Sequence, residues 1–304
     1  MFNSLSNRPS VVLTPTPIRE VAPGLLMKFE MDNPGGSHKW RAARRIIDFA
    51  VERGDITIGK TTILEKTGGN FGFGLALACA EYGLPIDLVV GPSFSIRKRK
   101  LLEQYGAICV GDDMMRDGMR PPDVTDWLLE NQSSLGKTYF FTNQHFNIDG
   151  TDAHEFETGK EIVEQLREIP GLEQVTFIGC AGTGAHMTGI SKALNKAGLL
   201  ARAIFVDPDG CDSQAGIFVE HPFEGISVMI PPLLDWSLVH DHRTVTTAEM
   251  RETQLQFARS NGFLIGNTSA ACLKIASDIS REKQVNGRHK VFTIAYDHAL
   301  WYLS

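Results

Sequence analysis

The chain has 304 residues, of which 42% are hydrophobic and 22% are charged, and this composition excludes a disordered or collagen-like protein. Its 36 acidic residues outnumber the 30 lysines and arginines, so the formal net charge of -6 gives no reason to expect binding to nucleic acid or to an anionic membrane surface. The chain has no apolar run of about 18 residues and no secretory signal pattern at its start, and we therefore expect a cytoplasmic protein without a membrane span.

Short apolar runs alternate with longer amphipathic patterns along the chain, which is typical of strands joined by crossover helices. The predicted strands are Leu26–Met31, Thr62–Glu65, Ile86–Val90, Ile108–Gly111, Tyr139–Thr142, Val175–Gly179, Ala203–Asp207 and Val291–Tyr296. The predicted helices are Lys39–Arg53, Phe71–Tyr82, Ile96–Tyr105, Thr151–Arg167, Ala185–Ala197, Thr247–Ser260 and Ser269–Glu282. The sequence therefore predicts an α/β fold with parallel sheets.

Two further segments are predicted to be loops, and one pair of residues marks the start of a helix. Glycine, proline and aspartate gather in Arg116–Val124 and Asp207–Pro232, which we predict to be loops. Thr246 stands three residues before Glu249, a capping-box pattern for the helix that follows. The strands are numerous enough for two α/β layers, and the cleft between such layers is a common place for a small-molecule site.

The first motif is a turn-rich loop, residues 33–41, that leads into a helix with Lys39 in its first turn. A cation at this end opposes the helix dipole, so the amine loses its proton more readily than in water. A neutral amine can attack a carbonyl carbon. The alternative interpretation is a solvated surface lysine.

The second motif, residues 66–72 (Lys-Thr-Gly-Gly-Asn-Phe-Gly), follows an apolar strand and opens a helix. Its glycines allow backbone amides to approach a ligand closely. The alternative is a tight turn in which Asn70 caps the helix.

The third motif, residues 179–189, is again a strand that leads through glycines into a helix, as in a phosphate-binding loop. No Gly-Lys-Ser/Thr follows, so it is not a P-loop, and it lacks the Gly-x-Gly-x-x-Gly spacing of a dinucleotide site. With no acidic residue about 20 positions beyond such a fingerprint, a nicotinamide enzyme is disfavoured. The alternative is a turn that only packs helix against sheet.

In this order the three motifs resemble the pyridoxal-phosphate enzymes of the tryptophan synthase β, cysteine synthase and threonine synthase superfamily, and the resemblance runs from Leu13 to Ser304. It implies two three-layer α/β domains with largely parallel sheets. The smaller, mobile domain would comprise residues 38–145. The larger domain, which binds the cofactor phosphate, would comprise residues 1–37 and 146–304.

The resemblance also implies roles for individual residues. Residues 37–41 resemble the family's Ser-x-Lys-x-Arg, which makes Lys39 the Schiff-base lysine and the catalytic base. Residues 67–72 resemble Thr-Ser-Gly-Asn-Thr-Gly, which places Asn70 on the phenolic oxygen of the cofactor. The segment that resembles the family's phosphate loop is Gly182, Thr183, Gly184, Ala185 and His186. Residues 266–270 look like Gly-Ile-Ser-Ser-Gly, so Thr268 would face the pyridine nitrogen. The substrate would lie among Thr67, Gly68, Gly69, Phe71, Gln144 and Ser227.

Three departures from the family pattern bear on the activity. Gly68 and Phe71 stand where cysteine synthases have a serine and a threonine, which removes two hydroxyl groups. Residues 225–228 replace the family's Gly-Ile-Gly, so we expect a remodelled pocket wall. His38 before Lys39 is similar to tryptophan synthase β, but the longer loop of that enzyme is missing.

The resemblance implies a homodimeric enzyme with pyridoxal 5'-phosphate as cofactor and a small amino acid as substrate. The activity it favours is β-replacement on a serine-derived amino acid through an aminoacrylate, as in cysteine synthase. The alternatives are a β-eliminating ammonia lyase or a threonine synthase-like lyase, and a non-catalytic binding protein with the same fold. Lys39 together with Asn70 argues against the non-catalytic alternative.

Other reactive side chains receive structural interpretations. Asp297 and His298 are adjacent residues near the last predicted strand, and adjacent side chains on a strand face opposite sides, so they are not expected to form a catalytic pair. Lys98 is predicted to lie on a solvated helix face. The cysteines are widely spaced without Cys-x-x-Cys, so we predict buried thiols and no metal site. They are Cys79, Cys109, Cys180, Cys211 and Cys272.

Overall fold

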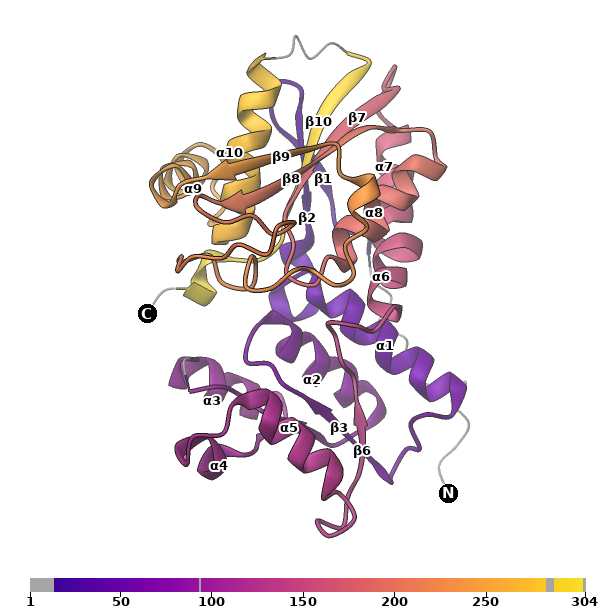
Figure 1. The fold of residues 1–304 in the computed structure, drawn as a ribbon. Coiled ribbons are helices and arrows are strands. Elements are labelled where there is room, and N and C mark those ends of the chain that lie inside the picture. The colour runs from indigo at the N-terminus through magenta and orange to yellow at the C-terminus, as the bar shows by residue number, and fades with distance from the viewer. Residues whose placement is uncertain (1–13, 93, 283–286, 303–304) are drawn as a thin grey trace.

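The computed structural model describes residues 14–92, 94–282 and 287–302, and it contains two sheets (Figure 1). The six-stranded sheet has the order β1-β2-β10-β7-β8-β9, with β1 (Ile18–Ala22), β2 (Leu25–Phe29), β7 (Gln174–Gly179), β8 (Leu200–Pro208), β9 (Asp241–Val245) and β10 (His289–Ala295). The four-stranded sheet has the order β5-β4-β3-β6, with β3 (Thr61–Glu65), β4 (Ile86–Leu88), β5 (Ala107–Cys109) and β6 (Thr138–Phe141). Neighbouring strands run parallel except for the antiparallel pair β1 and β2.

Helices cover both sheets. They are α1 (Lys39–Arg53), α2 (Asn70–Tyr82), α3 (Ile96–Gln104), α4 (Asp112–Arg116), α5 (Pro121–Glu130), α6 (Asp149–Ala153), α7 (Gly159–Arg167), α8 (Ala185–Lys196), α9 (Thr247–Asn261) and α10 (Asn267–Glu282). Helices α7 and α8 lie on one face of the six-stranded sheet, and α9 and α10 lie on the other (Figure 1). Within the described residues, no helix is long and apolar enough to cross a membrane.

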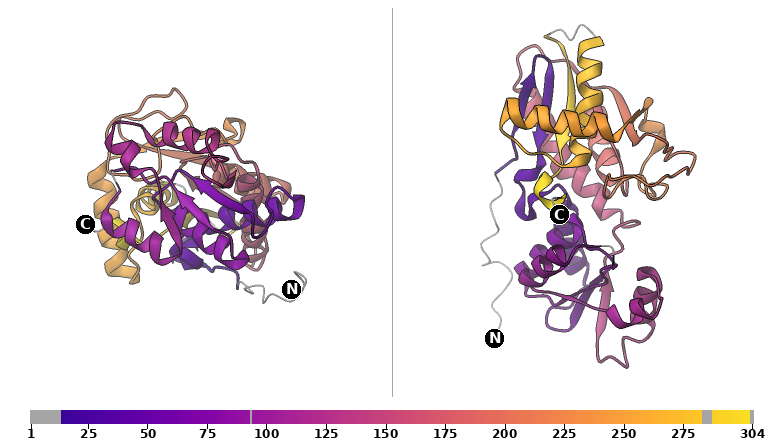
Figure 2. Two further views of the ribbon diagram at one scale, coloured as in Figure 1. Left: turned by 90° about the horizontal axis from the view of Figure 1, so that it is seen from below. Right: turned by 90° about the vertical axis from the view of Figure 1, so that its left-hand side faces the viewer.

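Each sheet has its own apolar core. One core surrounds the six-stranded sheet and includes Phe29, Phe177 and Phe292. A second core joins α1 and α2 to the four-stranded sheet. Figure 2 shows that the part built on the four-stranded sheet lies at one end of the part built on the six-stranded sheet. The division into domains at residues 38–145 remains a prediction.

The α/β fold with largely parallel sheets is confirmed, and the prediction of α1 is correct at both ends. Thr246 and Glu249 form the expected capping box: the Thr246 hydroxyl accepts from the Glu249 amide at 3.2 Å, and the Glu249 carboxylate accepts from the Thr246 amide at 3.0 Å. The described cysteines are free thiols, and only Cys109 is not fully buried.

Two local predictions are wrong or incomplete. Arg116–Val124 is not a loop, because α4 ends at Arg116 and α5 begins at Pro121. Proline fits the first turn of a helix, where its missing N–H has no intrahelical partner in any case. Strands β1 and β9 are not among the predicted strands, because they are short edge strands with exposed polar residues and hence weak apolar patterns.

Candidate active site

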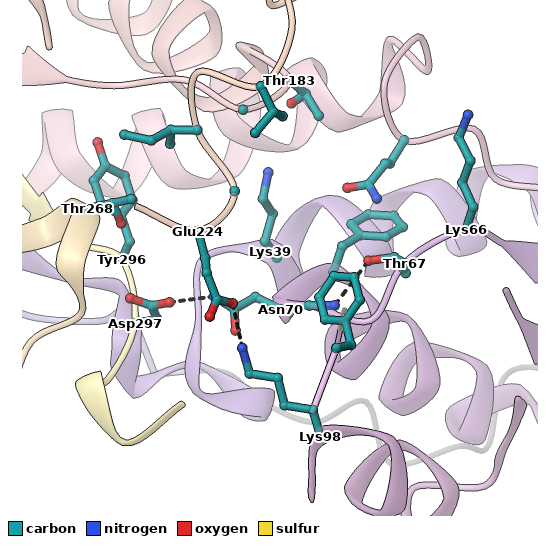
Figure 3. Close-up of a pocket in the computed structure, with 18 of the residues that line it drawn as sticks. Lys39, Lys66, Thr67, Asn70, Lys98, Thr183, Glu224, Thr268, Tyr296 and Asp297 are labelled. Atoms are coloured by element: carbon teal, nitrogen blue, oxygen red, sulfur yellow. Dashed lines mark hydrogen bonds and ion pairs between the residues drawn. The ribbon is translucent and has the colours of Figure 1, made fainter. Parts of the chain in front are cut away.

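A cavity of about 800 Å³ lies between the parts of the protein built on the two sheets. The residues that line it include those that follow β3, β6, β7 and β10 in the sequence. These are carboxyl ends of parallel strands, where α/β proteins typically bind ligands. Figure 3 shows how side chains from both parts converge on this space.

Lys39 is the first residue of α1, and it lines the cavity with its amine on the side of Thr183 (Figure 3). The start of the helix is fixed to the end of β10, because the His38 amide donates to the Tyr296 carbonyl at 3.1 Å. Burial lowers the pKa of Lys39 to about 8, which increases the fraction of neutral amine near neutral pH. These surroundings argue against a solvated surface lysine and suit a nucleophilic amine.

The second motif forms a tight turn at the start of α2. The Gly72 amide donates to the Gly69 carbonyl at 2.9 Å, and Gly69 is the N-cap residue. The interpretation of Asn70 as the cap is therefore wrong. Its amide nitrogen instead donates to Asp297 Oδ2 at 2.5 Å (Figure 3). Thr67, Gly69, Asn70 and Phe71 line the cavity, whereas Gly68 is buried and does not line it.

The third motif forms a glycine cradle before α8, and its glycines leave no room for a side chain. A Cβ on Gly182 would lie 2.3 Å from the Gly225 carbonyl oxygen. Gly184 has a φ of +91°, and its Cβ would lie 2.3 Å from the Leu234 amide nitrogen. Gly182 and Thr183 line the cavity, and Ala185 lines a smaller adjoining one. The glycines and the helix N-terminus fit a phosphate group.

Three histidines lie together beneath Lys39. The ring centroids of His38 and His186 are 5.1 Å apart, and His154 lies 5.8 Å from His38 and 6.0 Å from His186. Burial lowers the pKa of each of these imidazoles, so they are neutral at pH 7. His186 thus faces inward, with its Nε2 3.2 Å from the Tyr296 hydroxyl. Both ring nitrogens of His38 are buried without a hydrogen-bond partner, which leaves a donor and an acceptor for a ligand.

Thr268 and Gln144 line the cavity, but the structure does not bring Ser227 into it. The Ser227 hydroxyl donates to the buried carboxylate of Asp207, which also accepts from the Ser213 amide at 2.7 Å. This carboxylate holds the loop that follows β8, because it accepts hydrogen bonds from both Ser213 and Ser227. The Ser227 hydroxyl is thus bonded within the protein, and a role of Ser227 in binding substrate stays a prediction.

Two features of the cavity wall differ from the sequence-based expectations. Asp297 does not lie on a strand, because β10 ends at Ala295, and it bonds to Asn70 and to Tyr302. Lys98 is not a solvated residue, since it is 9% exposed and its amine lies 2.6 Å from Glu224 Oε2. Asn70 and Glu224 are distant in sequence from Asp297 and Lys98, so no local pattern could have revealed these two contacts.

The Asp297 carboxyl should make stability depend on pH in a defined window. Burial raises its pKa from 3.8 to about 6, so the native state holds this proton more tightly than the unfolded chain does. Its contribution to the free energy of unfolding therefore falls as the pH rises from about 4 to about 6. Urea unfolding of the wild type and of Asp297→Asn should show a difference that changes across this window. A constant difference between pH 4 and pH 7 would contradict the assignment.

The comparisons with known proteins agree with this geometry. Residues 10–297 match the family described as "Pyridoxal-phosphate dependent enzyme". A cysteine synthase of Flavobacterium is 32% identical over 243 residues, which cover 79% of this chain and 76% of the relative.

Two solved structures are also similar. O-ureido-L-serine synthase superposes with a TM-score of 0.83 at 26% identity, covering 100% of this chain and 94% of that one. The O-acetylserine-dependent cystathionine β-synthase of Helicobacter pylori superposes with a TM-score of 0.79 at 27% identity, covering 95% of this chain and 94% of that one. With a cavity that presents a lysine amine, a glycine-rich cradle and an asparagine loop, the chain belongs to the pyridoxal-phosphate-dependent enzyme family.

Proposed function

We propose that the chain catalyses β-replacement on a serine-derived amino acid, in the manner of the relatives named cysteine synthase and O-ureido-L-serine synthase. The observation that carries this proposal is the Lys39 amine, whose pKa is lowered to about 8, inside a cavity bounded by the glycine cradle and the Asn70 loop. The reaction class follows from these groups and from the relatives.

The residues of the cavity fit pyridoxal 5'-phosphate. Lys39 would bind its aldehyde, and the amides of residues 182–186 would hold its phosphate, where added Cβ atoms would clash. Asn70 would face the phenolic oxygen, because its amide nitrogen donates one N–H to Asp297 and keeps a second N–H. Thr268 would face the pyridine nitrogen. When bound, the cofactor supplies an electron sink for the pair released at the α-carbon.

The protein's own groups then bind the substrate and move its proton. The backbone amides of the Thr67–Phe71 loop and the side chain of Gln144 would hold the substrate carboxylate. The Lys39 amine would take the α-proton, since its lowered pKa keeps part of it neutral near pH 7. A neutral hydroxyl from Thr268 does not stabilise a protonated ring nitrogen as a carboxylate does, so we expect loss of a β-substituent rather than transamination.

Incubation with O-acetyl-L-serine tests this function. The holoenzyme should release acetate and should form a β-substituted amino acid when a thiol is present, as mass spectrometry would show. Release of ammonia and a keto acid at the same rate with or without the thiol would identify a β-eliminating lyase instead. Binding of cofactor without release of acetate, phosphate or ammonia from O-acetyl-, O-phospho- or unsubstituted serine would identify a non-catalytic protein.

We further propose that the enzyme acts in the cytoplasm as a homodimer, because the family resemblance implies that assembly. Sedimentation equilibrium of the purified protein should give about twice the mass of the chain. A single-chain mass at micromolar concentration would contradict this.

A further inference from the structure

Position 68 lacks the hydroxyl group that cysteine synthases have there, and the structure shows what takes its place. A Cβ built on Gly68 would lie 2.6 Å from Cγ of Phe94 and 2.7 Å from Cγ1 of Val90. Real Cβ atoms do not approach other atoms so closely, so even alanine does not fit without a shift of Phe94. The Phe94 ring therefore occupies the space that a serine side chain at position 68 would need.

The wall of the cavity beside this position is apolar. Phe94, Phe71 and Val89 line it. Phe71 stands where cysteine synthases have a threonine. Ile226 lines the cavity from the remodelled loop that follows β8. The chain thus exchanges two hydroxyl groups near the substrate for aromatic rings. Such rings attract an apolar or aromatic ligand by burial and by edge-to-face or offset stacking.

A positive charge lies at the same cavity. Lys66 is half-buried and lines it, and, unlike Lys98 with Glu224, its amine has no ion-pair partner among the residues that the structure describes. The charge of Lys66 also acts on His145. Burial, together with the charges of Lys39 and Lys66, lowers the pKa of that imidazole to about 4. An amine that forms no ion pair favours a ligand that carries negative charge.

We propose that the second substrate of this enzyme is an organic thiolate with an apolar, preferably aromatic, body, which packs against Phe94 and Phe71 and is attracted by Lys66. This inference rests on the proposed β-replacement and specifies its nucleophile. It identifies Phe94 as a residue that determines which nucleophile is preferred, and Lys66 as a residue that attracts anionic nucleophiles in general. A hydrosulfide ion has no apolar body and gains nothing from the aromatic wall.

The bonds and charges of the reaction balance without an oxidant or reductant. A thiol loses its proton to solvent, and the sulfur electron pair forms a bond to Cβ of the serine-derived substrate. The Cβ–O bond of the ester breaks, and its electron pair leaves with acetate. The α-proton taken by Lys39 returns to the α-carbon, so the products are an S-substituted cysteine and acetate.

A competition assay tests the inference. Holoenzyme and O-acetyl-L-serine are mixed with equal concentrations of thiophenol and hydrosulfide, and the ratio of S-phenylcysteine to cysteine is measured by mass spectrometry. The wild type should favour S-phenylcysteine. Phe94→Ala should lower the ratio by about tenfold, the size of effect typical for a lost hydrophobic contact in a specificity pocket. Phe94→Leu, which keeps an apolar side chain and guards against a folding defect, should lower it less.

Two further variants separate the contribution of the Lys66 charge from that of the aromatic wall. Lys66→Met should slow both anionic nucleophiles by a similar factor and leave the product ratio unchanged. Phe156→Ala alters a half-exposed phenylalanine that does not line the cavity and should change neither quantity.

Each negative outcome has a distinct meaning. If acetate is released but the wild type forms mainly cysteine, or if both Phe94 variants keep the wild-type ratio, the inference about the nucleophile is overturned while β-replacement stands. If no nucleophile gives a β-substituted product and no acetate is released, the proposed function itself fails.

Discussion

Lys39→Ala should give a folded protein that has no absorbance band from covalently bound cofactor and at least about 10³-fold lower kcat, in line with the usual contribution of a positioned acid–base group. The structure gives the reason. Lys39 is the cavity lysine at the start of α1, and burial lowers its pKa to about 8. The substitution removes a partly desolvated amine and little packing, so the free energy of unfolding should change by about 1 kcal/mol or less.

Borohydride reduction followed by peptide mapping gives the direct measurement. The wild type should carry a pyridoxyl group on the peptide that contains Lys39, and the variant should not. Lys66→Ala is the matched control, because Lys66 lines the same cavity directly after β3 and should leave the band intact. A pyridoxyl group on Lys66, or a band that persists in Lys39→Ala, would refute the assignment of Lys39.

The pH dependence of cofactor loading provides a second readout of the same amine. Only the neutral amine attacks the aldehyde, so the loading rate should rise about tenfold per pH unit below pH 8 and level off above it. An unperturbed lysine, with a pKa of about 10.4, would show no plateau before pH 10. Stopped-flow absorbance between pH 6 and pH 9.5 distinguishes a lysine with a lowered pKa from an unperturbed one.

The parts of the site that could be predicted from the sequence are those built from contiguous residues. Lys39 at a helix start, the Asn70 turn and the glycine cradle each depend on a few neighbouring positions, where glycine and helix-end chemistry leave a local signal. The fold class was predictable for a similar reason, because apolar periodicity reports burial along a single element.

The parts of the site that could not be predicted depend on contacts between segments that are distant in the sequence. Asp297 meets Asn70 across 227 positions, and Lys98 meets Glu224 across 126. Ser227 was assigned to the substrate by its place in a motif, but its hydroxyl bonds to Asp207, 20 positions earlier. Such pairings arise when the chain folds, and no pattern within a short window specifies them.

A substitution in the glycine cradle of residues 182–186 should have the second large effect. Gly184→Ala places a Cβ 2.3 Å from the Leu234 amide nitrogen at a φ of +91°, so the backbone must move as well as adopt a strained conformation. The loop before α8 should then lose the close approach that the cofactor phosphate needs, and the affinity for pyridoxal 5'-phosphate should fall by at least about tenfold, which corresponds to ~1.4 kcal/mol.

Gly198→Ala separates this effect from backbone strain. Gly198 follows α8 with a φ of +71°, but a Cβ there meets nothing within 4 Å. Both variants should therefore lose some free energy of unfolding, since alanine disfavours positive φ, whereas only Gly184→Ala should release cofactor on dialysis. Cofactor fluorescence titrations and urea unfolding measure the two quantities separately. Equal cofactor affinity in the two variants would mean that the phosphate does not lie in this cradle, and residues 182–186 would then serve only to pack α8 against the sheet.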